Sequence, residues 1–211
     1  MSSNPDPTAS DPAVEIPVPT GEVRLLAAIQ RQLLAVPGSR EAAVTLSRVG
    51  EHALGWMAVA AAGMAVDPAR RGRWAMVGVG SLGAHATSVI VKRVIRRRRP
   101  DHPTVAVGVG TPSKLSFPSS HATSTTAFAL LAGSVTGGPV APTLVPVMLA
   151  SRLVLGVHYP SDVFAGAAVG AGCAALTRAV WPSDAVQSML PEALRDGAAG
   201  PGVPQNPEEN R

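Results

Sequence analysis

The 211-residue chain has a formal net charge of +4, and 46% of its residues are apolar while only 15% are charged, below the ~25% of soluble domains. An aromatic content of 3% together with 21 glycines is unlike a water-soluble core and is typical of helices that pack closely in lipid. The single cysteine, Cys173, excludes an intrachain disulfide and a thiol–metal cluster, and the lack of a basic stripe interleaved with aromatic residues argues against nucleic-acid binding.

The N-terminal region has two parts. Residues 1–20 are rich in Pro, Ser and Asp and lack the basic and apolar regions of a signal peptide, which predicts a disordered tail. Residues 21–48 are predicted to form an amphipathic segment at the membrane surface. Between Glu22 and Val36 the apolar residues recur at helical spacing, and polar residues such as Gln30 fall outside that face. Such a helix is too polar to span the membrane.

The central region, residues 49–182, contains five apolar blocks and predicts an all-α integral membrane bundle of five transmembrane helices. A helix needs ~20 residues to cross the hydrocarbon core, with a lower limit of ~17, so the first and third blocks are slightly short unless flanking residues join them. Residues 183–211 are polar and contain several Pro and Gly residues, which predicts a second tail. The five blocks are His52–Val66, Trp74–Val91, Ala122–Thr136, Val140–Val157 and Asp162–Trp181.

Five alternating spans would bring the two most polar segments of this region to the same face of the membrane. The first segment runs from Lys92 to His121, and the second runs from Arg152 to Asp162. Convergence of polar segments that are far apart in sequence is what a functional site requires. We therefore expect the site at one surface of the membrane.

Three short motifs in these segments contain the residues suited to phosphate chemistry. A phosphate monoester carries about two negative charges at neutral pH, and Lys92, Arg99 and Arg152 supply cations that can hold it. Ser119 can add a hydroxyl donor, and backbone N–H groups at the start of the following helix can add more. The motifs read Lys92-x6-Arg99-Pro100, Pro118-Ser119-Ser120-His121 and Ser151-Arg152-x5-His158-x3-Asp162.

The two histidines of these motifs suit phosphoryl transfer. A neutral imidazole can attack phosphorus, and a protonated imidazole can protonate a leaving oxygen. Asp162 follows His158 by four residues, about one helical turn, and can hold one ring nitrogen so that the other is the nucleophile. Asp162 can also cap the last helix. The sequence has no visible metal-ligand cluster, so we expect neither a metal nor another cofactor.

In this order and spacing, the motifs resemble the signature motifs of the type-2 phosphatidic acid phosphatase and vanadium haloperoxidase superfamily. The resemblance implies that His158 is the nucleophile, Asp162 its partner and His121 the general acid, with a phosphohistidine intermediate that water hydrolyses. The chain departs from the family's usual P-S-G-H at Ser120. A serine there keeps the backbone N–H that the family's glycine offers to phosphate, and it can add a hydroxyl donor.

Several other polar residues have simpler interpretations. Arg93 and the arginines at 96–98 are expected to form mainly a juxtamembrane cluster that sets topology or binds anionic lipid. His85 falls inside a predicted span, where a hydrogen bond to a neighbouring helix is the favoured interpretation. Glu51 and His52 begin the first span on the side of the site. For them, contact with a lipid headgroup and simple surface exposure both stay open.

A membrane-embedded site favours a lipid phosphate as the substrate, because an apolar tail can enter between helices while the phosphate meets the cations. The composition and the stretch "GEHALGW" before the first span resemble one subgroup, the decaprenylphosphoryl-5-phosphoribose phosphatases of bacteria that build cell-wall arabinan. Undecaprenyl diphosphate, phosphatidate and phosphatidylglycerol phosphate stay open as alternative substrates.

The charge distribution also predicts location and partners. The resemblance implies a protein of the bacterial plasma membrane. Arginines near the spans are more numerous on the side of the site, which predicts an active site on the cytoplasmic face. Small-residue helix faces are compatible with a homo-oligomer. Two other classes stay open. Soluble relatives with these motifs bind vanadate and oxidise halides, against which the apolar blocks argue, and a non-catalytic scaffold could bind anionic lipid through its arginines.

Overall fold

The computed structural model describes Val18 and residues 21–195, so most of both predicted tails lies outside the described residues. Within the described part the chain is a bundle of α-helices, which confirms the all-α fold. The α-helices are α1 (Gly21–Leu34), α2 (Ser39–Val49), α3 (Leu54–Val66), α4 (Arg71–Ile95), α5 (Ser120–Thr136), α6 (Val140–Val154), α7 (Pro160–Val180) and α8 (Asp184–Met189). Three short 3-10 turns accompany them, η1 (Glu51–Ala53), η2 (Pro68–Arg70) and η3 (Glu192–Leu194).

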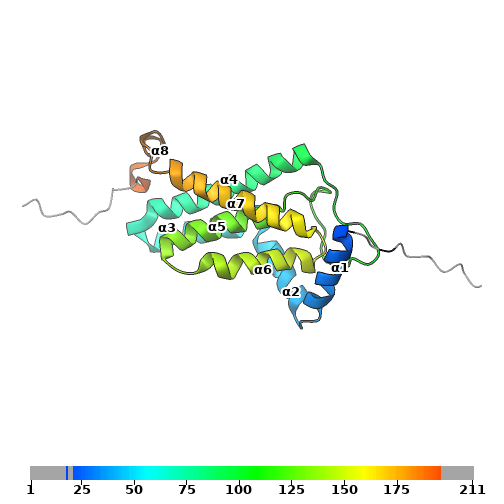
Figure 1. The fold of residues 1–211 in the computed structure, drawn as a ribbon. Helices are drawn as coiled ribbons and strands as arrows, with labels where there is room; N and C mark the ends of the chain where they lie inside the picture. The colour runs from blue at the N-terminus through cyan, green and yellow to red at the C-terminus, as the bar shows by residue number, and fades with distance from the viewer. Residues whose placement is uncertain (1–17, 19–20, 196–211) are drawn as a thin grey trace, which may run out of the picture.

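Helices α4 to α7 run side by side along the bundle, with α1 and α2 at one end and α8 at the other (Figure 1). Helices α3 to α7 match the five predicted blocks to within a few residues, but the predicted count of five spans is not confirmed. By length and composition, η2 with α4 and α7 can each cross a membrane, and α2 with α3 adds a third span if that pair, bent by 50°, is one broken span. Helices α5 and α6 have 17 and 15 residues, and at ~1.5 Å per residue they are shorter than a ~30 Å hydrocarbon core.

Helix α5 lies at the centre of the bundle and packs against α4, α6 and α7. Most of its residues are buried, including Thr123 and Thr125. Their hydroxyls are satisfied locally, because Thr123 Oγ1 donates to the carbonyl of Ser119 at 2.9 Å and Thr125 Oγ1 accepts from the indole N–H of Trp56 at 3.1 Å. A helix with polar groups on several sides can therefore form the core without an unpaired hydroxyl at these positions.

Two glycines let α7 approach the start of α5 closely. A Cβ on Gly166 would lie 2.7 Å from the carbonyl oxygen of Ser119, and a Cβ on Gly170 would lie 2.3 Å from that of Thr123. At the same close contact, the backbone N–H of Ser119 donates to the carbonyl of Asp162 at 3.0 Å. Small residues thus place the second and third motifs side by side.

Helix α1 is formed as predicted, but its environment differs from the expectation in one respect. Gln30, expected outside the buried face, is 3% exposed. Its side-chain amide donates to the carbonyls of Ala106 and Val154, at 2.7 and 2.9 Å, and its oxygen accepts from the N–H of Ala106. Leu26 is fully buried beside it, while Leu25 is half exposed. The amide forms hydrogen bonds with backbone groups of a loop and of the last residue of α6, and helical periodicity cannot reveal such contacts. Helix α1 therefore packs against the bundle through polar as well as apolar contacts.

The C-terminal segment is also more ordered than the sequence suggested. Ser183 caps α8, its hydroxyl accepting from the N–H of Val186 at 3.4 Å. Val186, Leu190 and Leu194 then recur at intervals of four residues and pack against the main hydrophobic core. Residues 183–195 therefore belong to the folded bundle rather than to the polar tail expected there.

Candidate active site

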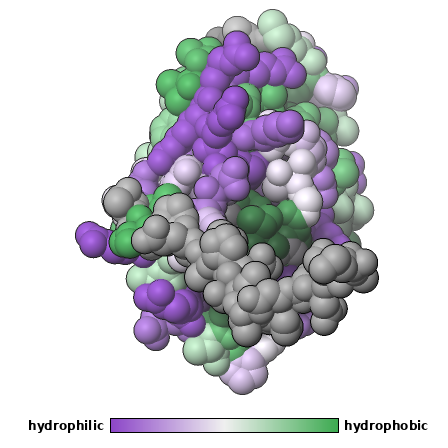
Figure 2. Space-filling view, turned by 90° about the vertical axis from the view of Figure 1, so that its right-hand side faces the viewer, coloured by the Kyte–Doolittle hydropathy of each residue, from purple (hydrophilic) through white to green (hydrophobic). Residues whose placement is uncertain are grey.

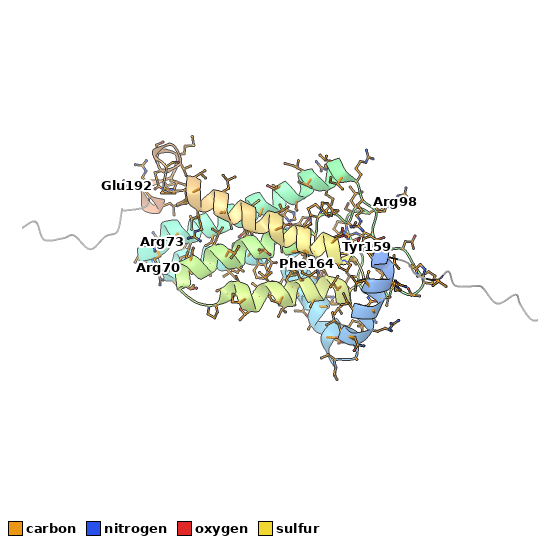
Figure 3. The ribbon with its side chains drawn as sticks, in the orientation of Figure 1. Arg70, Arg73, Arg98, Tyr159, Phe164 and Glu192 are labelled. Atoms are coloured by element: carbon orange, nitrogen blue, oxygen red, sulfur yellow. The ribbon has the colours of Figure 1, made fainter. Side chains whose placement is uncertain are left out.

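A cavity of about 240 Å³ lies between η1, α4, the loop between α4 and α5, and the start of α5. Hydrophilic side chains gather on the end face of the molecule near α1 (Figure 2). Arg98 and Tyr159 lie at this end, whereas Arg70 and Glu192 lie at the opposite end (Figure 3). Five of the eight predicted site residues line the cavity, namely Lys92, Arg99, Ser120, His121 and His158.

His158 lies in the loop between α6 and α7 and not on a helix. Its Nδ1 atom is 3.6 Å from Oδ2 of Asp162, slightly too far for a hydrogen bond. The same carboxylate oxygen accepts from the backbone N–H of Tyr159 at 2.8 Å, so Asp162 caps the start of α7. The structure is thus compatible with both interpretations of Asp162, because a small rotation of the imidazole would close the remaining gap.

The other nitrogen of His158 points to Arg99. Nε2 of His158 lies 3.2 Å from Nη1 of Arg99, and because a guanidinium can only donate, Nε2 accepts and the proton is assigned to Nδ1. Burial, together with the positive charges of Arg99 and Lys92, lowers the pKa of His158 to about 4 against the opposing effect of Asp162. The imidazole is therefore neutral at pH 7, and the electron pair of Nε2 faces the guanidinium of Arg99.

Lys92 and Arg99 hold the loop that surrounds the cavity. Lys92 Nζ donates to the carbonyl of Pro118 at 2.7 Å. Arg99 donates from Nε to the carbonyl of Ser113 at 2.8 Å and from Nη1 to that of Val157 at 2.6 Å. Burial lowers the pKa of Arg99 to about 10, which still leaves it charged at neutral pH. The two cations are fixed by neutral carbonyl oxygens and keep their net positive charge for an anion.

Arg152 and Ser119, both predicted phosphate ligands, lie behind the cavity wall. Arg152 is 2% exposed and donates to Oγ of Ser47 at 3.1 Å and to the carbonyl of Ala43 at 3.3 Å. Ser119 is fully buried, and its hydroxyl accepts from the N–H of Ala122 at the start of α5. In this structure Arg152 joins α6 to α2, and Ser119 caps α5.

His121 is the second residue of α5 and is held by the end of α2. Its Nε2 atom lies 2.9 Å from the carbonyl oxygen of Ser47, which can only accept, so Nε2 carries a proton and Nδ1 is left for a ligand. A Cβ on Gly50 would lie 2.8 Å from Cδ2 of His121. The bend after α2 therefore needs a residue without a side chain where it passes this ring.

Arg97 is a residue of the site that the sequence interpretation missed. Its Nη1 donates to Oδ1 of Asp162 at 3.0 Å and to Oγ of Ser161 at 2.6 Å, while Nη2 pairs with Glu22 of α1. The guanidinium also lies 4.0 Å from the ring centre of Tyr159. Arg97 thus occupies the carboxylate oxygen that faces away from the imidazole. In the sequence it is one arginine among several, and no spacing rule distinguishes it.

Glu22 anchors this arginine from the N-terminal helix. One carboxylate oxygen pairs with Arg97, and the other accepts from the backbone N–H of Ser161 at 3.0 Å. Burial alone would raise the pKa of Glu22, but the hydrogen bonds from Arg97 and Ser161 lower it overall. The charged carboxylate joins α1 to the first turn of α7.

Five further polar residues line the cavity, namely Glu51, His52, His85, Arg93 and Ser113. The rings of His52 and His85 are 5.7 Å apart. His85 was expected to bond a neighbouring helix, but its Nδ1 atom is buried and has no hydrogen-bond partner within the described residues. His52 and Ala53 have positive φ angles of 50° and 60°, and this kink between α2 and α3 turns the histidine toward α4.

The chain is similar to known phosphatases from two mycobacterial species. The chain is 52% identical over 162 residues to the decaprenylphosphoryl-5-phosphoribose phosphatase of Mycobacterium tuberculosis (strain CDC 1551 / Oshkosh), covering 77% of this chain and 92% of that protein. It is 56% identical over 148 residues to the protein of the same name from Mycolicibacterium smegmatis, covering 70% and 82%.

The fold has a counterpart among solved structures. A transmembrane PAP2 type phosphatidylglycerolphosphate phosphatase from Bacillus subtilis superposes with a TM-score of 0.59 at 22% identity, covering 74% of this chain and 84% of that one. Together with the two long apolar helices, this fold identifies an integral membrane protein. The family model of the PAP2 superfamily matches residues 73–184, more than half of the chain, and the chain belongs to that superfamily.

Proposed function

We propose that this protein is a lipid phosphate phosphatase that hydrolyses the phosphate monoester of decaprenylphosphoryl-5-phosphoribose. The observation that carries the proposal is that His158 is buried and neutral and that both His158 and Arg99 line the cavity. Nε2 of His158 lies 3.2 Å from Nη1 of Arg99. The substrate follows from the names of relatives that are 52–56% identical to this chain. The product would be the decaprenylphosphoryl ribose precursor of cell-wall arabinan.

In the first step, Nε2 of His158 attacks the phosphorus atom while Lys92 and Arg99 neutralise the phosphate oxygens. An N–P bond forms, and the bond between phosphorus and the ribose oxygen breaks. His121 enters this step as the imidazolium, with its Nε2 proton held by the carbonyl of Ser47, and donates its second proton, on Nδ1, to the leaving oxygen. Asp162 accepts the Nδ1 proton of His158 as a hydrogen bond and stabilises the positive charge that develops on the ring.

In the second step, water hydrolyses the phosphohistidine. His121, now neutral, takes a proton from the water as its oxygen attacks phosphorus. The new O–P bond forms, the N–P bond to His158 breaks, and inorganic phosphate leaves. Both histidines are then back in their starting protonation states, and the cycle uses side chains alone.

The direct phosphate contacts are assigned first to residues that line the cavity. Lys92, Arg99 and the backbone N–H and hydroxyl of Ser120 can reach a bound anion from the wall. Arg152 and Ser119 complete the predicted set, and they would touch phosphate only after giving up their present bonds to α2 and α5. In the ligand-free arrangement they fix the positions of the neighbouring motifs.

The proposed location is the bacterial plasma membrane with the site on the cytoplasmic face. Support comes from the arginines of α1, α2 and the loop after α4, which are more numerous than those near η2 and α8 and favour that side. A test is labelling of Arg98→Cys, in a Cys173→Ala background, with a membrane-impermeant maleimide. Intact spheroplasts should leave the thiol unlabelled, and rapid labelling would assign the site to the outer face. A homo-oligomer also stays a prediction, and the size of the protein in detergent would test it.

The test of the function is phosphate release by the purified protein in detergent with EDTA present. The substrates are a short-chain polyprenylphosphoryl-5-phosphoribose, undecaprenyl diphosphate, phosphatidate and phosphatidylglycerol phosphate. We expect the sugar-bearing lipid to be hydrolysed with the highest kcat/KM. A different preferred lipid would change the substrate but keep the phosphatase, and no release from any lipid would favour the lipid-binding scaffold.

A further inference from the structure

The cavity has more room and more polar groups than a phosphate alone would use. Its volume is about 240 Å³, whereas one water needs only about 10–15 Å³ of cavity volume in the same measure. The phosphate-binding cations and His158 form one side. Glu51, His52 and His85 line the same cavity from η1 and α4 and take no part in the proposed steps.

The charge of Glu51 is the first clue to what these residues bind. Glu51 is the one carboxylate among the residues that line this cavity, and no ion pair joins it to a cation within the described part of the chain. A carboxylate beside a phosphate pocket repels the phosphate unless it faces hydrogen-bond donors. The part of the ligand next to Glu51 should therefore donate hydrogen bonds rather than carry negative charge.

The two histidines give the second clue. Nδ1 of His85 is buried without a hydrogen-bond partner in the described residues, and leaving such an atom unpaired is unfavourable. The ring of His52, 5.7 Å away, is held there by two successive residues with positive φ, a strained backbone of the kind that occurs at ligand sites. A neutral imidazole has one donor and one acceptor, as a hydroxyl does.

We propose that Glu51, His52 and His85 form a subsite for the vicinal hydroxyls of a pentose that carries the phosphate. The proposal rests on the proposed function, since it extends the same cavity from the phosphate to the sugar. A carboxylate that accepts from a ribose hydroxyl is a recurrent solution in nucleotide sites, and a few polar groups suffice to orient a ligand in a pocket. This subsite would let the enzyme distinguish a sugar phosphate from a simple lipid phosphate.

The test measures binding, so that it does not depend on turnover. The inactive His158→Ala chain, purified in detergent, is titrated by calorimetry with methyl ribofuranoside 5-phosphate and with methyl phosphate. The first probe has the ring closed at C1 and both vicinal hydroxyls, and the second has the phosphate alone. We expect the sugar phosphate to bind at least about 10-fold more tightly. Adding Glu51→Gln should reduce that ratio to within about twofold of unity without weakening the binding of methyl phosphate.

Two further variants make the result decisive. His52→Asn removes the imidazole but keeps a residue that tolerates positive φ, and it should also lower the affinity ratio, which settles the matter if Glu51→Gln does not fold. Glu41→Gln, an exposed glutamate of α2, is the matched control and should change neither affinity.

The subsite is overturned if both probes bind equally to the starting protein, or if the ratio survives both Glu51→Gln and His52→Asn. It is also overturned if the two affinities fall together, because that result means loss of the phosphate pocket. The active chain can still release phosphate from lipids in each of these cases, so failure of the subsite is distinguishable from failure of the proposed function.

Discussion

The region from α4 to α7 and the region from α1 to η1 contribute to the site in different ways. The first contains all three motifs, and five of its predicted residues line the cavity. The second contains no motif, yet Glu22 pairs with Arg97 and the carbonyl of Ser47 holds His121. The comparison teaches that reacting groups can be identified by motif, whereas the groups that orient them lie on a segment whose sequence resembles a surface helix.

The largest expected effect comes from the nucleophile in the motif-bearing region. His158→Ala should lower phosphate release by at least about 10⁴-fold, since loss of a nucleophile removes the covalent route. The measurement is single-turnover release from the sugar-bearing lipid in detergent. Acid-labile phosphate on the wild-type protein, absent from the variant, would identify the intermediate. Residual activity within 10-fold of wild type would assign the attack to another group.

The next effect tests whether Arg97, held by Glu22 of the N-terminal region, orients the site. Arg97→Ala should lower kcat by about 10- to 100-fold, as loss of a residue that orients a reacting group commonly does, because Asp162 Oδ1 loses its partner. Arg97→Lys should recover part of this loss, and Glu22→Gln should cost less than Arg97→Ala. The assay is kcat and KM on the same lipid.

The matched control for this series is Arg98→Ala, which removes the exposed neighbouring arginine and should stay within about twofold of wild type. Equal losses for Arg97→Ala and Arg98→Ala would mean that both residues act only through the general positive charge of the loop. A rise in KM with unchanged kcat would likewise argue against orientation of Asp162.

A smaller effect, on stability rather than turnover, tests how α1 is attached. Gln30→Leu leaves the backbone groups of Ala106 and the carbonyl of Val154 without their partner, and should cost about 2 kcal/mol of stability. Gln32→Leu, an exposed position on the same helix, is the control and should change little. The measurement is thermal unfolding in detergent. Equal midpoints for both variants would show that the apolar contacts of α1 suffice.

The smallest expected change is in the charge of His158 between pH 7 and pH 5. Because its pKa is lowered to about 4 from 6.5, the folded protein keeps this ring neutral above about pH 5. The unfolded chain binds the proton near pH 6.5, so this group's contribution to stability is complete above that pH and decreases as pH falls toward 4. Histidine NMR, with His158→Ala for assignment, should show a neutral ring at pH 5.5, and titration near pH 6.5 would contradict this environment.

The proposed catalytic residues could be singled out in the sequence because their chemistry imposes spacing on the chain. Lys92, Arg99 and His158 were identified by motif, and they line one cavity. Arg152 also belongs to a motif, but the structure has it bonded to α2. A spacing rule identifies the residues that lie near the site. It does not say which of their side chains line the cavity before a ligand binds.

The sequence by itself determined the all-α bundle, the helices that form it and the motifs at one end, because apolar runs and motif spacing are local properties of the chain. Only the tertiary structure decided that Arg97 contacts Asp162, that Gln30 is buried and that Glu51, His52 and His85 share the cavity with His158. These contacts join residues that are far apart in sequence. They depend on the path of irregular loops and on a kink with positive φ angles, for which hydropathy and periodicity give no signal.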